Sequence, residues 1–155
     1  MSPLKPGDKA PNFEALNQNN ELVKLTDLRG KKVLIYFYPK AMTPGCTVQA
    51  SHLRDNLADF IANGVDVIGI SIDTPDRLAK FIVRDNLNFT LLSDPDHKIT
   101  EAFGVWGEKK FMGKVFDGIH RISFLIDEEG TIIECFDKFK TSDHHEVVLN
   151  RIKTL

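Results

Sequence analysis

Hydrophobic and polar positions along the chain follow patterns typical of buried strands and of amphipathic helices. Residues 33–38 form a continuous β-branched and aromatic run, VLIYFY, which predicts a central strand covered on both faces. The similar run at 65–72 predicts a second buried strand. Near the N-terminus, the apolar segments 13–16 and 21–25 flank a polar Asn-Gln-Asn-Asn stretch, and this arrangement predicts a β-hairpin.

Helical spacing of apolar residues appears after the first of these strands and again after the second. Five apolar positions before Asn63-Gly64 predict one helix of about four turns: Ala50, Leu53, Leu57, Phe60 and Ile61. Thr74 and Pro75 supply an N-cap and a first-turn proline for the next helix. A last amphipathic helix is expected over 143–153, with Asp143 and Glu146 in capping-box spacing.

The remaining segments complete an alternation of strands and helices. Residues 89–92 predict a short strand, 93–103 a short helix, and 121–126 with 131–136 a second hairpin. Residues 104–120 have no clear period, so we expect a long loop rich in bulky apolar side chains, namely Trp106, Phe111, Met112 and Phe116. This order predicts an α/β fold with a mixed sheet and helices on both faces, compatible with a thioredoxin-like fold.

Length, composition and charge narrow the class of protein. The 155 residues, 42% of them hydrophobic, favour one domain spanning 1–155. Twenty basic against 22 acidic residues give a net charge of −2, which argues against nucleic acid as a partner. No apolar run is long enough to span a membrane and no targeting segment is evident, so we expect a cytoplasmic protein without a membrane partner.

The two cysteines, Cys46 and Cys135, indicate thiol chemistry or none. Cys46 stands where the central strand has ended and the next helix begins. Unpaired backbone N–H groups and the helix dipole at that point stabilise an anion such as a thiolate. Cys46 is equally well placed to be a small core residue on the same helical stripe as Ala50 and Leu53. Position alone leaves both interpretations open.

The residues around Cys46 favour the reactive interpretation. Pro39, Thr43 and Cys46 form a Pro-x-x-x-Thr-x-x-Cys pattern that resembles the active-site signature of peroxiredoxins. Further stretches look like the bacterioferritin-comigratory-protein, or PrxQ, branch of that family: residues 36–39, 44–47, 69–71 and 122–127. The resemblance implies a thioredoxin-like fold in which Cys46 is the peroxidatic nucleophile. It also implies that Pro39 shields the thiolate and that Thr43 hydrogen-bonds the peroxide.

The resemblance extends to Arg121, which opens the predicted C-terminal hairpin and matches the family arginine that approaches the reactive sulfur. Thr43, Gly45, Cys46 and Arg121 would then bind the substrate. Two departures from the family pattern affect the rest of the cycle. A resolving cysteine is often found five positions after the peroxidatic one, where this chain has Ser51, and the helix over 75–87 contains no cysteine either. A glutamate of the usual hydrogen-bond network is replaced by Gln49.

Two other features have simpler interpretations. Cys135 lies among apolar neighbours and is expected to be a buried structural thiol. Its alternative role, as a distant resolving thiol, would need substantial movement or a second chain. His144 and His145 are adjacent and therefore do not face the same way on a helix, so a solvated helix start is expected rather than a metal site.

We therefore expect a monomeric thiol peroxidase that reduces hydrogen peroxide or small organic hydroperoxides through a Cys46 sulfenic acid. The sulfur carries the redox change, so no metal, haem or flavin is needed. Without a nearby resolving thiol, the reductant would be external: thioredoxin, glutaredoxin or glutathione. Two alternatives are a disulfide oxidoreductase, which Thr43 disfavours by replacing the first cysteine of a Cys-x-x-Cys motif, and a noncatalytic redox sensor or binding module.

Overall fold

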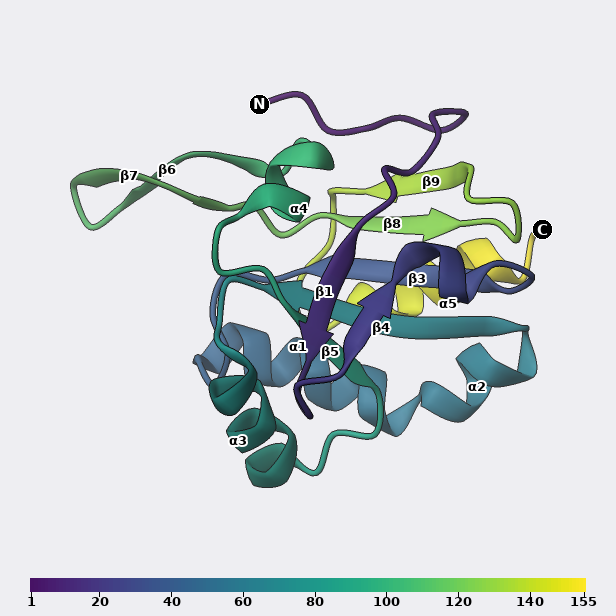
Figure 1. Ribbon diagram of the computed structural model, residues 1–155, viewed down its shortest axis with the longest axis horizontal. Helices are drawn as coiled ribbons and strands as arrows, with labels where there is room; N and C mark the ends of the chain where they lie inside the picture. Colours follow the sequence, from purple (N-terminus) through teal and green to yellow (C-terminus); the bar gives the residue numbers. More distant parts are fainter.

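A seven-stranded mixed sheet forms the centre of the protein in the computed structural model, which describes residues 1–155 (Figure 1). The strand order is β2-β1-β5-β4-β3-β8-β9. These strands are β1 (Glu14–Asn17), β2 (Leu22–Lys24), β3 (Lys32–Phe37), β4 (Val65–Ser71), β5 (Thr90–Ser93), β8 (Ser123–Ile126) and β9 (Ile132–Phe136). Strands β3, β4 and β5 are parallel, whereas β1 and β8 pair with them antiparallel. The predicted mixed sheet and both predicted hairpins are confirmed.

Helices cover both faces of the sheet, as expected. One face packs against α1 (Pro44–Asp55), α2 (Leu57–Ala62), α3 (Pro75–Asp85) and α5 (His144–Ile152). The other face packs against the 3-10 helix η1 (Leu25–Leu28) and the short helix α4 (Lys98–Ala102). Burial on both faces explains the unbroken apolar run of β3, in which Leu34 and Tyr36 face one core while Val33 and Ile35 face the other.

The single long helix expected after β3 is wrong in one respect, because the structure has two helices separated at Asn56. The backbone of Asn56 leaves the helical region, with φ −112° and ψ 9°. Its side-chain amide donates to the carbonyl oxygen of His52 at 2.8 Å, in competition with the continuing helix. Ile61, which was expected on the buried stripe, lies in α2 and is exposed.

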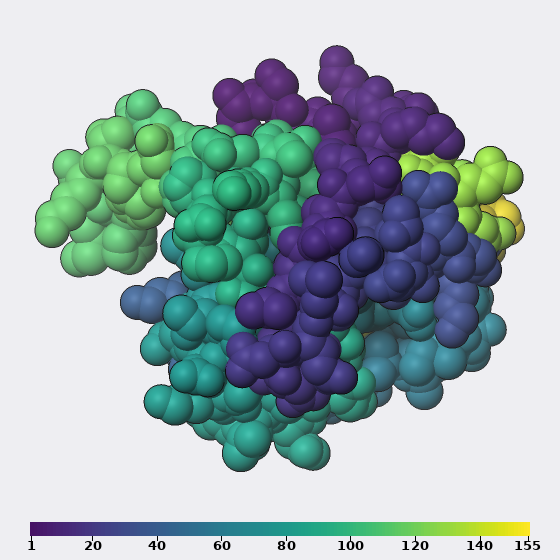
Figure 2. All heavy atoms as spheres, viewed as in Figure 1, coloured from purple at the N-terminus to yellow at the C-terminus, as the bar shows by residue number.

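The expected loop over 104–120 is also wrong. Residues in this segment form a two-stranded hairpin, β6 (Trp106–Phe111) and β7 (Lys114–Ile119). Met112 and Gly113 both have positive φ, 50° and 78°, which is the backbone geometry of a tight two-residue hairpin turn. The hairpin extends away from the sheet, and its tip forms a separate lobe on the surface (Figures 1 and 2). Phe111, Met112 and Phe116 are exposed there and do not cover a core.

The start of α5 differs from the expectation in two ways. His144 and His145 are buried, not solvated, because the first turn of α5 packs against β3, β8 and α1. Asp143 makes no side-chain cap to the helix and accepts instead from the backbone N–H of Lys140, so the capping box does not form. None of the helices combines the length and the apolar character that crossing a bilayer requires.

Candidate active site

Cys46 is the third residue of α1 and is buried, with 1% of its surface exposed. Thr43 is the N-cap of this helix and Pro44 its first residue, so the helix begins abruptly after the turn that follows β3. Cys46 packs in one core with Ala50 and Leu53 and also lies where helical N–H groups have no intrahelical partner. Both environments considered from the sequence are therefore present at once.

Arg121 contacts the sulfur of Cys46 directly. Its Nη1 lies 3.3 Å from Sγ and also donates to Oε1 of Gln49 at 2.9 Å. The residue lies in the segment between β7 and β8, two positions before the strand that it was expected to open. Gly45 makes room for it, since a Cβ at that position would lie 3.3 Å from Nη2 of Arg121. A guanidinium at this distance stabilises a thiolate by a charge-assisted hydrogen bond.

Gln49 affects how much of the arginine charge is available to the sulfur. Its side chain is buried, and its Nε2 has no hydrogen-bond partner. A carboxylate at this position would neutralise part of the guanidinium charge, whereas the amide oxygen orients Arg121 without cancelling it. The departure from the family pattern at Gln49 therefore leaves the positive charge of Arg121 facing Cys46.

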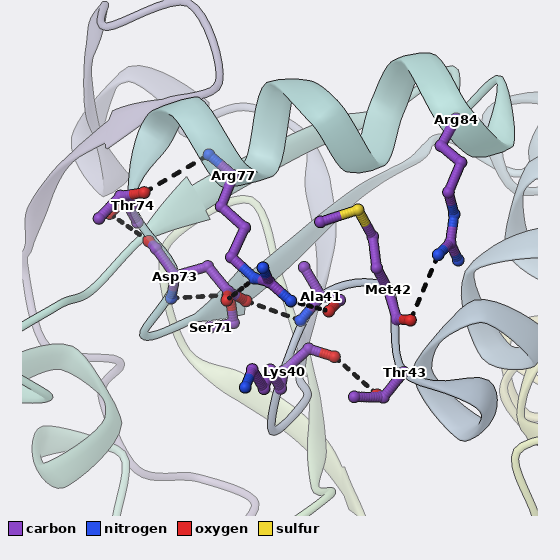
Figure 3. Close-up of polar contacts among 10 residues, drawn as sticks. Lys40, Ala41, Met42, Thr43, Ser71, Asp73, Thr74, Arg77 and Arg84 are labelled. Atoms are coloured by element: carbon purple, nitrogen blue, oxygen red, sulfur yellow. Dashed lines mark hydrogen bonds and ion pairs between the residues drawn. The ribbon is translucent and has the colours of Figure 1, made fainter.

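Thr43 and Pro39 lie on the path from β3 to Cys46. The hydroxyl of Thr43 donates to the carbonyl oxygen of Lys40 at 2.8 Å (Figure 3). Because the hydroxyl proton is engaged there, Oγ1 retains lone pairs that can accept a hydrogen bond from a hydroperoxide. Met42, between them, adopts φ 65°, a left-handed conformation that costs on the order of 1 kcal/mol for a non-glycine residue. Pro39 is half-buried and lies two residues after the end of the strand.

Lys109 is a neighbour of the site that the sequence did not reveal. It belongs to β6, in the segment that was expected to be a loop, and its Nζ donates to the carbonyl oxygen of Ile119 at 2.8 Å. Partial burial and the positive charge of Arg121 lower the pKa of Lys109. Only the pairing of β6 with β7 brings this residue toward Arg121, so no local sequence signal could have identified it.

A cluster of buried polar rings lies on the same face of the sheet as Cys46. Nε2 of His144 is 2.8 Å from Oγ of Ser123, and the His144 ring contacts Tyr36. Burial, and then the nearby His145 and Arg121, lower the pKa of His144 to about 3. His145 stacks on His52 with ring centroids 4.6 Å apart, and burial likewise lowers its pKa. His144 and His145 are therefore uncharged at neutral pH.

Cys135 occupies a different environment from Cys46. It lies on β9 and is half-buried, not fully buried as expected, because it packs at the margin of the core on the opposite face of the sheet. Burial, and then the acidic side chains of Asp137 and Glu134, raise the pKa of the Cys135 thiol to about 11. No group of three or more His, Cys, Asp or Glu side chains is placed to hold a metal ion.

Comparison with known proteins identifies the family. The AhpC/TSA family profile matches residues 6–135. Peroxiredoxin Bcp of Escherichia coli is 63% identical over 153 residues, covering 99% of this chain and 98% of the relative. A putative peroxiredoxin of Haemophilus influenzae is 60% identical over the full length of both chains. Among solved structures, a mutant of Xylella fastidiosa PrxQ has a TM-score of 0.92 at 29% identity, covering 99% of this chain and 98% of that one.

The fold, together with Cys46 at the start of α1, defines a thioredoxin-like protein with a site suited to thiol chemistry. The chain belongs to the AhpC/TSA family, and within that family to the peroxiredoxins of the Bcp/PrxQ branch.

Proposed function

We propose that this peroxiredoxin is a thiol-dependent peroxidase in which Cys46 is the peroxidatic nucleophile. The observation that carries the assignment is the contact of 3.3 Å between Nη1 of Arg121 and Sγ of Cys46 at the start of α1. Together, the helix N-terminus and the guanidinium favour the thiolate, which is the nucleophilic form of cysteine. Peroxiredoxin relatives that match the whole chain support the same activity.

The first half of the cycle oxidises Cys46. Its thiolate attacks the terminal oxygen of the hydroperoxide, an S–O bond forms, the O–O bond breaks, and the departing oxygen leaves as an alcohol or water after taking up a proton. Arg121 stabilises the charge that develops on the departing oxygen, while Thr43 and the backbone N–H of Cys46 hold the peroxide. Gly45 leaves the space that Arg121 needs, and Pro39 shields the thiolate from solvent.

The second half of the cycle needs an external thiol. Cys135 lies on the opposite face of the sheet from Cys46, and position 51 carries a serine. An external thiol condenses with the sulfenic acid to give a mixed disulfide and water, and a second thiol releases Cys46 as a thiol together with a disulfide product. We propose thioredoxin, glutaredoxin or glutathione as this reductant.

The remaining properties follow from the same proposal. The substrates are hydrogen peroxide and small organic hydroperoxides; a relative, the Xanthomonas campestris bacterioferritin comigratory protein, has been studied for alkyl peroxide reduction. The whole chain, 1–155, acts as one domain and as a monomer. Because Cys46 is recycled by external thiols and Cys135 stays a free thiol in this scheme, we propose a reducing compartment, the cytoplasm, as its location.

A peroxide titration tests the proposal against a noncatalytic sensor. With a thiol donor present, we expect many turnovers of peroxide per chain, and peptide analysis without the donor should find a Cys46 sulfenic or sulfinic acid. A single stoichiometric oxidation without turnover would instead support the sensor. A disulfide between Cys46 and Cys135 within one chain would contradict the one-cysteine cycle.

A further inference from the structure

The turn formed by residues 40–43, called here the 40–43 turn, is held from outside by side chains of another part of the fold. Ala41 is fully buried in this turn, and both of its backbone polar groups are engaged (Figure 3). Its N–H donates to Oδ2 of Asp73 at 2.7 Å, and its carbonyl oxygen accepts from Nη2 of Arg77 at 3.1 Å. Asp73 and Arg77 therefore fix the position of Ala41 from both sides.

Asp73 is itself anchored at the ends of two parallel strands. Its carboxylate accepts from Oγ of Ser71 at 2.7 Å and from Nε of Arg77 at 3.0 Å. Its carbonyl oxygen accepts from Oγ of Ser93 at 2.6 Å. Because β4 and β5 end at the same edge of the sheet as β3, this buried carboxylate lies under the turn that leads from β3 to Cys46.

Arg84, farther along α3, joins the 40–43 turn to the first turns of α1. Its Nη1 donates to the carbonyl oxygen of Met42 at 3.3 Å, and its Nη2 donates to Oγ1 of Thr47 at 2.7 Å. Met42 has the left-handed backbone conformation, which most side chains disfavour, so the turn depends on external contacts to keep its shape. Thr47 is adjacent to Cys46. The guanidinium of Arg84 therefore links Met42, which precedes Thr43, to a residue that follows Cys46.

Because Cys46 is buried, small and large reactants differ in how easily they reach its sulfur. A hydroperoxide has to bring only its terminal oxygen to Sγ of Cys46, beside Arg121. A large thiol must bring its own sulfur to within bonding distance of a Cys46 side chain whose residue is 1% exposed. Reaction with a large thiol therefore requires the 40–43 turn or the first turn of α1 to move. The contacts of Asp73, Arg77 and Arg84 oppose that movement.

We propose that Asp73, Arg77 and Arg84 are positioning residues that form a clamp on the 40–43 turn and set how often Cys46 opens to large thiols and disulfides. The inference rests on the proposed function of Cys46. In the closed state the thiolate meets peroxide. In the open state the sulfenic acid condenses with an external thiol to give a mixed disulfide and water. Asp73 and Arg77 form the fixed part, and Arg84, whose side chain is 47% exposed, forms the part that releases first.

Arg84→Met tests the clamp, and Arg54→Met is its matched control. Nη1 of Arg54 donates to the carbonyl oxygen of Asp85 at 2.6 Å, so this arginine also joins α1 to α3, but away from the 40–43 turn. Both variants are made in a Cys135→Ser background, which leaves Cys46 as the only thiol. The probe is dithiodipyridine, a bulky aromatic disulfide that Cys46 attacks to form a mixed disulfide with release of one thiopyridone, measured by absorbance.

We expect Arg84→Met to raise the rate of this exchange by about fivefold, the size expected when charge-assisted hydrogen bonds at a partly exposed site are lost. The second-order rate of Cys46 with hydrogen peroxide should not rise. Arg54→Met should change neither rate by more than about twofold, because its contact does not hold the turn. Loosened packing in general, or a more nucleophilic sulfur, would instead accelerate both reactions together.

Equal rates with dithiodipyridine in the Arg84→Met variant and the parent chain would overturn the clamp. An equal acceleration by Arg54→Met, or a parallel rise in the peroxide rate, would also overturn it. Failure of the parent chain to react with peroxide would contradict the proposed function alone, because the exchange with dithiodipyridine measures opening without any peroxide chemistry.

Discussion

The surroundings of Cys46 and of Cys135 differ in charge as well as in burial, since Cys46 is buried and Cys135 is half-buried. Cys46 faces the guanidinium of Arg121 at the start of a helix, whereas Cys135 lies mid-strand beside Glu134 and Asp137. Both thiols are removed from bulk solvent to some degree, and burial alone disfavours a thiolate in either place. In the proposed function, the thiol that acts as the nucleophile is the one that faces a fixed positive charge, which compensates for its desolvation.

The sheet itself separates the two cysteines. Cys46 belongs to the core packed by α1, α3 and α5, and Cys135 to the core on the other face. A disulfide between them would have to cross a layer of paired strands, because alternate residues of β9 face opposite cores. Their chemistry is therefore expected to be independent, and each of the following experiments addresses that expectation.

The largest effect is expected from removing each sulfur in turn. Cys46→Ser should abolish peroxide turnover, because a serine hydroxyl cannot be oxidised as the thiolate is. Cys135→Ser should retain most of the activity. Peroxide consumption with dithiothreitol as the thiol donor measures both. Loss of turnover in Cys135→Ser, with an unchanged circular dichroism spectrum, would mean that the two thiols cooperate.

The next largest effect should come from removing Arg121, the arginine beside Cys46. An arginine near Cys135 provides the control. Arg121→Met is expected to slow peroxide oxidation of Cys46 by about 100-fold, the usual effect of deleting one donor to a developing oxyanion. Arg151→Met is the matched control, since Arg151 pairs with Glu134 at 3.2 Å next to Cys135. Stopped-flow measurement of the second-order rate compares the two. Similar rates in both variants would remove Arg121 from the proposed site.

A smaller effect concerns the reactivity of Cys135 with pH. The pKa of this thiol is raised to about 11, so the thiolate fraction at pH 8 is far below that of an ordinary cysteine. Part of this deficit is offset because a more basic thiolate is more nucleophilic. In the Cys46→Ser variant, alkylation by iodoacetamide should be about tenfold slower than for free cysteine at pH 8 and should keep rising toward pH 10. A plateau between pH 8 and 9 would contradict this environment.

The smallest expected effect is a loss of stability at low pH. It comes from His144, which is buried on the face of the sheet that holds Cys46. The pKa of His144 falls from 6.5 to about 3 on folding, so between these values the unfolded chain binds a proton that the folded chain excludes. Stability should therefore decrease as the pH falls through this window, by about 1 kcal/mol from pH 7 to 5.5 for this group. Urea unfolding at the two pH values measures the loss. His144→Gln should show a smaller loss than His120→Gln; equal losses would exclude His144 as its source.

Much of this architecture could be predicted from local sequence. The continuous run at 33–38 indicated the central strand, and the Thr74-Pro75 pair indicated the start of α3. The position of Cys46 at a helix start followed in the same way. What could not be predicted depends on contacts distant in the chain. The burial of His144 is decided by its contacts with Ser123 and Tyr36, and Asp73 reaches Ala41 only after β3 and β4 pair.

Two failures were local and have local causes. Met112-Gly113 forms a tight turn without the asparagine or aspartate that usually marks one, so the β6–β7 hairpin carried no recognisable signal. Asn56 divided a helix whose apolar spacing continued through it, because its side chain competes for the carbonyl oxygen of His52. Apolar periodicity records which residues can be buried together, and it does not record where the backbone must bend.

The tip of the β6–β7 hairpin has a consequence for how oxidation of this protein is detected. Met112 is 86% exposed at the end of a projecting arm, in a chain whose substrates are oxidants. A methionine sulfoxide and a cysteine sulfenic acid each add a single oxygen atom, so the mass of the intact chain does not distinguish them. Peptide mapping, or replacement of Met112 by leucine, distinguishes oxidation of Met112 at the tip of the β6–β7 hairpin from oxidation of Cys46.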